Sequence, residues 1–168
     1  MNTWQRRVLG GAGLLVVGGV ALWVYTTMSS RTSFVPEAIH QQLTFTTVAP
    51  KNTTVQVETP SIKYDTTQKI LTFTATYQKR TLVITEQPLP QEFIDVPPAF
   101  DKFATDAGQY DQFDSAIGSV RLTKLPKQPD QQAAIIKTNV GVMMFIKPST
   151  SLTPDEWRQL VTQLDIER

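Results

Sequence analysis

The stretch Leu71–Glu86, LTFTATYQKRTLVITE, decides the fold that this sequence predicts. From position 71 to 77 apolar residues alternate with threonines, the period-two pattern of a strand with one buried and one wet face. Residues 78–80 should turn the chain, and residues 81–86 should return it as a second strand. We expect a β-hairpin here, and the turn type stays open because no glycine lies in the turn. The residues expected to point inward on the second strand are Leu82 and Ile84.

Segments rich in threonine, valine and aromatic residues predict further strands on both sides of the hairpin. These are residues 44–49, 54–58 and 61–64 before it, and residues 109–113, 118–124, 133–137 and 140–146 after it. The last segment, VGVMMFI, is apolar on both faces and predicts a central strand. Its Met143 and Met144 could supply an adaptable binding surface, but core packing is the better interpretation. Loops are expected at 87–108, leading into a helical turn with Phe100 and Phe103, and at 124–132.

Helices are expected at both ends of this domain. Pro36 begins a short helix of about two turns. Near the C-terminus, Thr153 and Glu156 have the spacing of a capping box, and an apolar stripe follows them. We therefore predict an α+β fold: one N-terminal transmembrane helix, then a mostly antiparallel β-sheet domain with flanking N- and C-terminal helices.

The predicted transmembrane helix is the uncharged run VLGGAGLLVVGGVALWVY, residues 8–25. Extended to Ser30, it would form a helix about 34 Å long, against a hydrocarbon core of about 30 Å. Arg6 and Arg7 precede the run and Arg31 alone follows closely, so the positive-inside bias places the N-terminus in the cytoplasm. The expected organisation is a cytoplasmic tail at 1–7, the transmembrane helix at 8–27, a linker at 28–33 and an extracytoplasmic α+β domain at 34–168.

Alternative interpretations of this run are less favoured. A cleaved signal peptide needs small residues before the cut, and the sequence offers only a poor Thr27-Met28-Ser29. The Arg6-Arg7 pair faintly resembles a twin-arginine export signal, but paired basic residues are ordinary topology determinants. Glycines seven residues apart on one face leave a homodimer through this helix open.

Composition excludes several classes of partner and fold. Arg6 and Arg7 are the two basic residues before position 31, so the outer portion keeps all but two of the 16 basic residues against 15 acidic, a net charge near −1. A near-neutral domain is not expected to bind nucleic acid or to adhere to an anionic membrane surface. No cysteine occurs, so disulfides, lipoprotein acylation and thiolate metal ligands are excluded, as is common in bacterial envelope proteins.

The residues that usually carry catalysis are sparse, and we predict no catalytic, cofactor-binding or metal-binding residues. His40 is the sole histidine, and no Gly-x-Ser-x-Gly elbow presents a nucleophile. A Ser-Lys pair stays open, because it needs only two residues that meet in space. An acidic run could suggest a cation site, but its spacing does not suit a calcium loop, and a solvated face is the better interpretation. Its members are Glu92, Asp95, Asp101, Asp106, Asp111 and Asp114.

Three stretches together resemble a family of bacterial membrane-anchored proteins with an extracytoplasmic domain of unknown function. They are VPEAIHQQLTFTTVAP (35–50), KILTFTATYQKRTLVITEQPLPQEF (69–93) and AIIKTNVGVMMFIKPSTSLTPDEWRQLVTQL (134–164). The resemblance covers most of residues 34–165 and rests on hydrophobic spacing. Some proteins of this general type are similar to the outer domains of anti-sigma regulators and to lipoprotein-carrier-like folds, which implies binding or sensing outside the membrane. It supplies no active-site residues.

The expected function is a non-enzymatic binding or sensor domain, anchored in the cell membrane, for an envelope or membrane protein partner. Its cytoplasmic tail, residues 1–7, is too short to hold a signalling domain. A carrier that shelters a lipid or other apolar ligand is the alternative, and an enclosed apolar cavity would favour it. An envelope hydrolase is third, and it would need a cleft where Ser, Lys, His40 or paired carboxylates converge.

Overall fold

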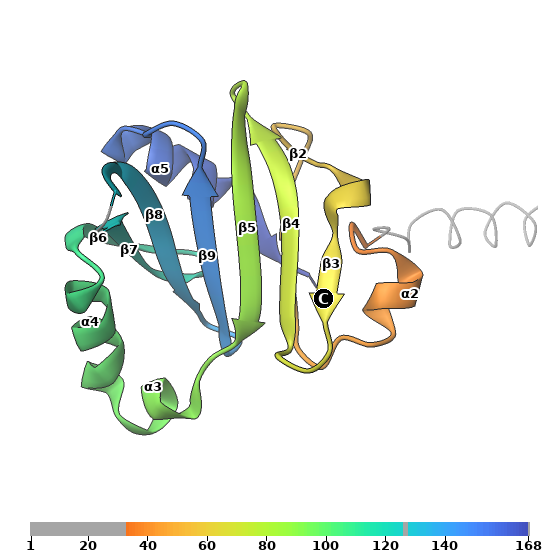
Figure 1. Ribbon diagram of the computed structural model, residues 1–168, viewed down its shortest axis with the longest axis horizontal. Helices are drawn as coiled ribbons and strands as arrows, with labels where there is room; N and C mark the ends of the chain where they lie inside the picture. Colours follow the sequence, from red (N-terminus) through yellow and green to blue (C-terminus); the bar gives the residue numbers. More distant parts are fainter. Residues whose placement is uncertain (1–32, 126–127, 168) are drawn as a thin grey trace, which may run out of the picture. The chain divides into compact units, whose positions relative to one another are not determined.

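The computed structural model describes residues 33–125 and 128–167. Its main sheet has eight strands in the order β2-β4-β5-β9-β8-β7-β6, with β3 pairing beside β2 on the same edge of β4 (Figure 1). Every strand pairing is antiparallel. The strands are β2 (Val55–Val57), β3 (Lys63–Asp65), β4 (Ile70–Tyr77), β5 (Arg80–Pro88), β6 (Gln109–Ser115), β7 (Gly118–Leu125), β8 (Gln128–Thr138) and β9 (Val142–Pro148).

The predicted hairpin is confirmed as β4 and β5. Their register runs from Leu71 opposite Glu86 to Tyr77 opposite Arg80, which leaves a two-residue turn. Both turn residues, Gln78 and Lys79, have positive φ, at 48° and 64°. Positive φ at both positions is the signature of a type I′ turn, whose twist matches that of the flanking strands. The twist of the hairpin therefore holds two non-glycine residues in the left-handed region.

The predicted central strand 140–146 is also confirmed. β9 lies between β5 and β8, and its adjacent methionines enter different cores on the two faces of the sheet. The loop expected at 124–132 is wrong, because β7 continues to Leu125 and β8 already begins at Gln128. A register shift after Lys124 accommodates this polar, proline-bearing stretch within the strand pair.

A second, two-stranded sheet joins β1 (Val48–Pro50) to β10 (Leu164–Ile166), close to the C-terminus. The sequence does not predict β10, because a strand of three residues shows no readable periodicity. Hydrogen bonds from Lys51 N–H to the Gln163 carbonyl and from Glu167 N–H to the Thr47 carbonyl extend the pairing. The second sheet therefore joins residues that lie more than a hundred positions apart in the sequence.

The helices differ from the prediction in the middle of the chain. The helical turn expected around Phe100 and Phe103 is confirmed as part of α4 (Pro97–Asp106), which has prolines at its start, where a missing N–H costs nothing. The loop expected before it is wrong in part, because residues there form a further helix, α3 (Gln91–Asp95). The expected N-terminal helix is the single turn α2 (Glu37–His40), which contains no buried residue. It is too short to cover a face of the sheet.

The C-terminal helix is confirmed as α5 (Pro154–Thr162). The Thr153 hydroxyl accepts a hydrogen bond from Glu156 N–H at 3.2 Å, and the Glu156 carboxylate accepts one from Thr153 N–H at 2.8 Å. This is the reciprocal capping box that the spacing predicted.

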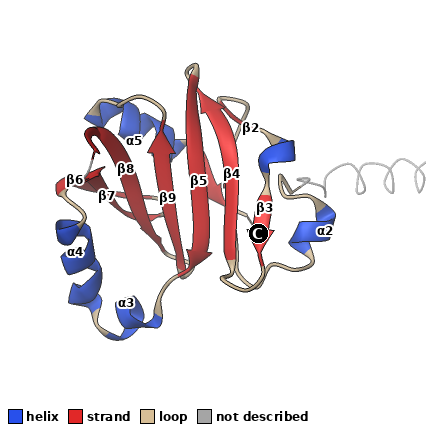
Figure 2. Ribbon diagram, viewed as in Figure 1, coloured by secondary structure: helices blue, strands red, loops and turns tan. Residues whose placement is uncertain are grey.

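The predicted fold class is wrong. The described residues form a mostly β domain with few helices (Figure 2). Most buried residues of the main core lie on strands of the main sheet or on β1 and β10, and few of them lie on helices. Among the residues described, no helix is long and apolar enough to cross a membrane. The predicted transmembrane segment at 8–27 lies outside the described residues.

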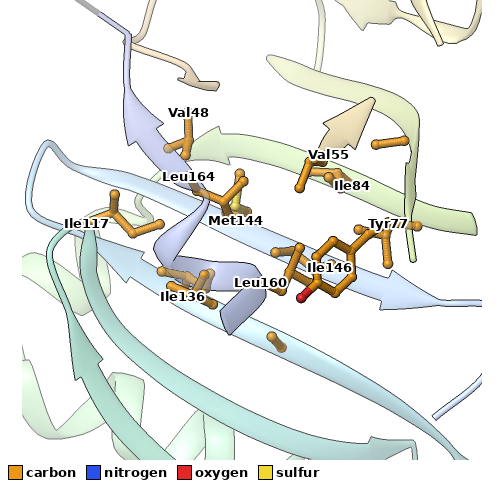
Figure 3. Packing of buried hydrophobic residues seen from close by; sticks show 14 of the residues in the cluster. Val48, Val55, Tyr77, Ile84, Ile117, Ile136, Met144, Ile146, Leu160 and Leu164 are labelled. Carbon is orange, nitrogen blue, oxygen red and sulfur yellow. The ribbon is translucent and has the colours of Figure 1, made fainter. Parts of the chain in front are cut away.

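The main core fills the space between one face of the sheet and α5, and several of its residues are shown in Figure 3. Trp157 and Leu160 of α5 are completely buried there, against Ile136 of β8 and Ile146 of β9 among others. A smaller cluster lies on the other face, where α3 and α4 pack on β8 and β9. Its buried members are Phe93, Phe100, Ile135 and Met143.

Candidate functional site

A hollow of about 380 Å³ lies where α4 meets β7 and β8. We call it the Arg121 pocket. Its polar lining joins two cations, one carboxylate, two hydroxyls and an amide, and its volume is in the range of small-molecule sites. The lining residues are Pro97, Phe100, Asp101, Ser119, Arg121, Lys137, Thr138 and Asn139.

Strand alternation places the polar residues on this face. Val120 and Leu122 of β7 point into the main core, so Ser119 and Arg121 point to the other side. Lys137 of β8 lies directly opposite Ser119. Helix α4 is held above them because its Phe100 is buried in the smaller cluster.

Arg121 is held in place by three contacts. Its side chain is 14% exposed, and its Nη2 donates to Asp101 Oδ1 at 2.8 Å. Nη1 donates to the Val120 carbonyl at 3.4 Å, and the guanidinium carbon lies 5.7 Å from the centroid of the Phe100 ring. The Nε atom is buried without an acceptor among the described residues. The protein thus keeps a positive charge in a defined orientation and at a desolvation cost.

Lys137 supplies a second positive charge to the pocket lining. Its Nζ lies 5.6 Å from the centroid of the Phe100 ring and donates to the Phe93 carbonyl at 3.4 Å. The two cations face one carboxylate, that of Asp101, which is 63% exposed. With a net charge of +1 among its lining residues, the pocket is suited to an anionic group.

Ser119 and Lys137 lie opposite each other in the pocket lining and are a serine and a lysine of the kind that the hydrolase interpretation needs in a cleft. The Ser119 hydroxyl donates to Asp114 Oδ1 at 2.7 Å, and the Lys137 ammonium donates to Phe93. Both are described residues, and no hydrogen bond joins them. Such catalysis needs a hydrogen bond between the serine nucleophile and the lysine base. The structure places the two residues on neighbouring strands but does not join them by such a bond.

A second hollow, of about 230 Å³, lies between α5 and the end of β6. Its lining also holds two cations, Lys51 and Arg158, and one carboxylate, Asp114. The Arg158 guanidinium carbon lies 5.1 Å from the centroid of the Phe113 ring, and its nitrogens lie 3.5 Å from an Asp111 oxygen and 3.8 Å from an Asp155 oxygen. The net charge of this lining is the same as that of the Arg121 pocket, but Arg158 pairs with two acids and is 45% exposed, whereas Arg121 pairs with one acid and is 14% exposed. The charge of Arg158 is therefore the more screened of the two.

Glu86 is an ionisable group buried in the protein interior, outside both hollows. It is 0% exposed, on the core-facing side of β5 in line with Leu82 and Ile84. Burial raises its pKa to about 8; the Val48 N–H, 3.1 Å from Oε2, opposes the shift, and the charge of Glu167 adds to it. Its Oε1 has no hydrogen-bond partner among the described residues. Glu86 therefore connects β5 to β1 as a neutral carboxyl group below this pKa.

The predicted solvated acidic face is confirmed in most of its members, and three of them form ion pairs. Five of the six acids are exposed and Asp111 is half-buried. Asp101, Asp106 and Asp111 pair with Arg121, Lys102 and Arg158. Within residues 33–125 and 128–167, no three histidine or acidic side chains lie close enough to hold a metal ion. His40 is exposed at the end of α2.

Sequence reasoning missed Glu86 and the pocket residues Arg121 and Lys137. The signal for Glu86 was present, because period two puts this acid in line with the inward Leu82 and Ile84. The strand pattern also indicated that Arg121 leaves the core, but it did not indicate that α4 would cover it.

No protein-family model matches the chain, and comparisons with curated proteins and with solved structures found no similar protein.

Proposed function

We propose that this chain is an extracytoplasmic binding or sensor domain, held at the cell membrane by residues 8–27, which binds an acidic group of its ligand in the Arg121 pocket. The ligand is an envelope component or an acidic segment of an envelope protein. The single observation that carries the proposal is the pair of cations, Arg121 and Lys137, in the lining of one hollow of about 380 Å³.

The arrangement supports binding because its charges are fixed before any ligand arrives. Arg121 loses little further freedom on binding an anion, since Asp101, the Val120 carbonyl and Phe100 already hold it. Its planar fork suits a carboxylate or phosphate, and a partly desolvated charge attracts such a group more strongly than one in open water.

A serine hydrolase is the second candidate, favoured by the juxtaposition of Ser119 and Lys137 across β7 and β8. It ranks below binding because the Ser119 hydroxyl donates to Asp114 and not to a base. A fluorophosphonate probe tests it: covalent labelling that disappears in Ser119→Ala would support catalysis, and we expect no labelling. The carrier interpretation would need an apolar cavity for its ligand. The main core gives it no support, because the side chains of Trp157, Leu160 and Ile136 are completely buried there.

An NMR titration tests the binding proposal. The full-length, ¹⁵N-labelled chain is kept in a neutral detergent because residues 8–27 are strongly apolar, and sodium acetate is added against sodium chloride at matched ionic strength. We expect saturable acetate-specific shifts of the Arg121 Nε–H signal and of the backbone N–H signals of Ser119 and Asn139.

Two variants locate the effect. Lys137→Gln removes a pocket charge and should weaken acetate binding by about three- to tenfold. Lys147→Gln removes the same charge from exposed Lys147 on β9, outside the pocket lining, and should leave binding unchanged. Identical acetate and chloride titrations of the unmodified chain would overturn the proposal.

A further inference from the structure

We propose that Asp101 acts as a built-in competitor for the ligand's acidic group, and that the ligand presents a singly charged carboxylate to Arg121. This inference rests on the proposed function and concerns the same pocket. Its basis is the asymmetry of one ion pair, in which the cation is buried and the anion is not.

The Asp101 carboxylate already occupies a position that a ligand carboxylate would take. Its Oδ1 accepts from Arg121 Nη2 at 2.8 Å, and both residues line the pocket. The Arg121 side chain is 14% exposed, whereas that of Asp101 is 63% exposed. A mostly exposed partner is held weakly, because water and salt screen its attraction. Asp101 can therefore be displaced from Arg121, while Arg121 stays in place.

Arg121 does not depend on Asp101 alone for its position. The Val120 carbonyl, 3.4 Å from Nη1, and the Phe100 ring, 5.7 Å from the guanidinium carbon, hold the group from two other directions. Phe100 is itself buried in the smaller cluster. Removal of the Asp101 charge therefore frees a donor without releasing the arginine.

The charges of the pocket favour a carboxylate over a phosphate. Arg121 and Lys137 together carry two positive charges, and Asp101 carries one negative charge. One monovalent carboxylate neutralises the remaining single positive charge. Asp101 stays in the lining after it releases Arg121, so its negative charge still counts. A phosphate dianion would leave excess negative charge beside it, where like charges disfavour binding.

A competitor role and a positioning role of Asp101 predict opposite results for the variant Asp101→Asn. If Asp101 competes, the amide variant binds acetate about three- to tenfold more tightly, and this gain shrinks as salt is added. If Asp101 instead positions Arg121 for the ligand, the same variant binds acetate more weakly. Asp101→Glu keeps the charge and should bind acetate about as the unmodified chain does.

The matched control is Asp106→Asn. Asp106 is the last residue of the same helix, pairs with Lys102 at 2.7 Å and does not line the pocket. The variant makes the same change in net charge, so its acetate affinity should stay within about twofold of the unmodified chain. A gain equal to that of Asp101→Asn would show a general charge effect and overturn the inference.

The experiment is the same acetate titration of the full-length chain, with Asp101→Asn and the unmodified protein side by side and inorganic phosphate as a second probe. Absence of acetate binding by the unmodified chain overturns the proposed function. Acetate binding by the unmodified chain, with equal or weaker binding by Asp101→Asn, overturns only the competitor role. Tighter binding of phosphate than of acetate overturns the assignment to carboxylates.

Discussion

The buried Glu86 carboxyl makes the stability of this domain depend on pH in a direction that can be calculated. Its pKa is about 8 in the folded protein, against the ordinary value of 4.5 for a glutamate carboxyl group. Between these values the unfolded chain has lost a proton that the folded chain keeps. The free energy of unfolding therefore falls as pH rises from about 4.5 to about 8, and it is level with respect to this group outside that range.

The size of the effect follows from the shift. At about 1.36 kcal/mol per pKa unit, the full loss across the range is on the order of 5 kcal/mol, a large share of the 5–15 kcal/mol typical of a domain. Glu86→Gln removes the titration and keeps an oxygen that can accept from the Val48 N–H. We expect the variant to be more stable than the unmodified chain by about 2–4 kcal/mol at pH 8.5, after about 1–2 kcal/mol is allowed for the buried amide N–H.

Urea unfolding from pH 5 to pH 9 measures this. Replacement of Trp4 and Trp23 by Phe in all proteins leaves Trp157, fully buried in α5, as the fluorescence reporter. The unmodified protein should lose stability across the range and Glu86→Gln should not. Glu92→Gln, at an exposed position of α3, is the control and should follow the unmodified curve. Parallel pH curves for Glu86→Gln and the unmodified chain would refute the reasoning.

Three further predictions concern the backbone. Replacing Gln78 by Asn together with Lys79 by Gly relieves the positive φ of the hairpin turn and should add about 1–2 kcal/mol, seen as a higher urea midpoint. Gly118→Ala should destabilise the chain by at least about 2 kcal/mol, because φ is 145° and a Cβ would overlap the backbone of β8, whereas Gly141→Ala meets open space and should cost about 1 kcal/mol. Thr153→Ala removes the cap of α5 and should cost about 1 kcal/mol in the same assay, and an unchanged midpoint would contradict the capping role.

Local patterns in the sequence were enough to predict several elements. Alternation over Leu71–Tyr77 predicted β4, the apolar run around Met143 predicted the interior strand β9, and Thr153 with Glu156 predicted the start of α5. Each signal lies within a few consecutive residues. Strand period, burial on two faces and helix capping are properties of a single segment, so they can be read before the segments are assembled.

The helix content and the candidate site were decided by tertiary structure. The sequence predicted only a helical turn around Phe100 and Phe103 in the proline-rich segment before β6. The segment forms α3 and the whole of α4 because Phe93 and Phe100 bury against Ile135 and Met143 of distant strands, a gain that no local propensity contains. β10 exists because β1, more than a hundred residues earlier, offers it an edge.

The Arg121 pocket likewise depends partly on local sequence and partly on tertiary structure. The sequence determined which residues of β7 and β8 leave the core, since alternation in a strand is a local rule. Only the folded domain decided that Ser119 lies opposite Lys137, that Asp101 reaches Arg121 and that the Phe100 ring lies within 6 Å of two cations. These relations depend on strand register and on the packing of α4, and both are set by contacts between residues far apart in the chain.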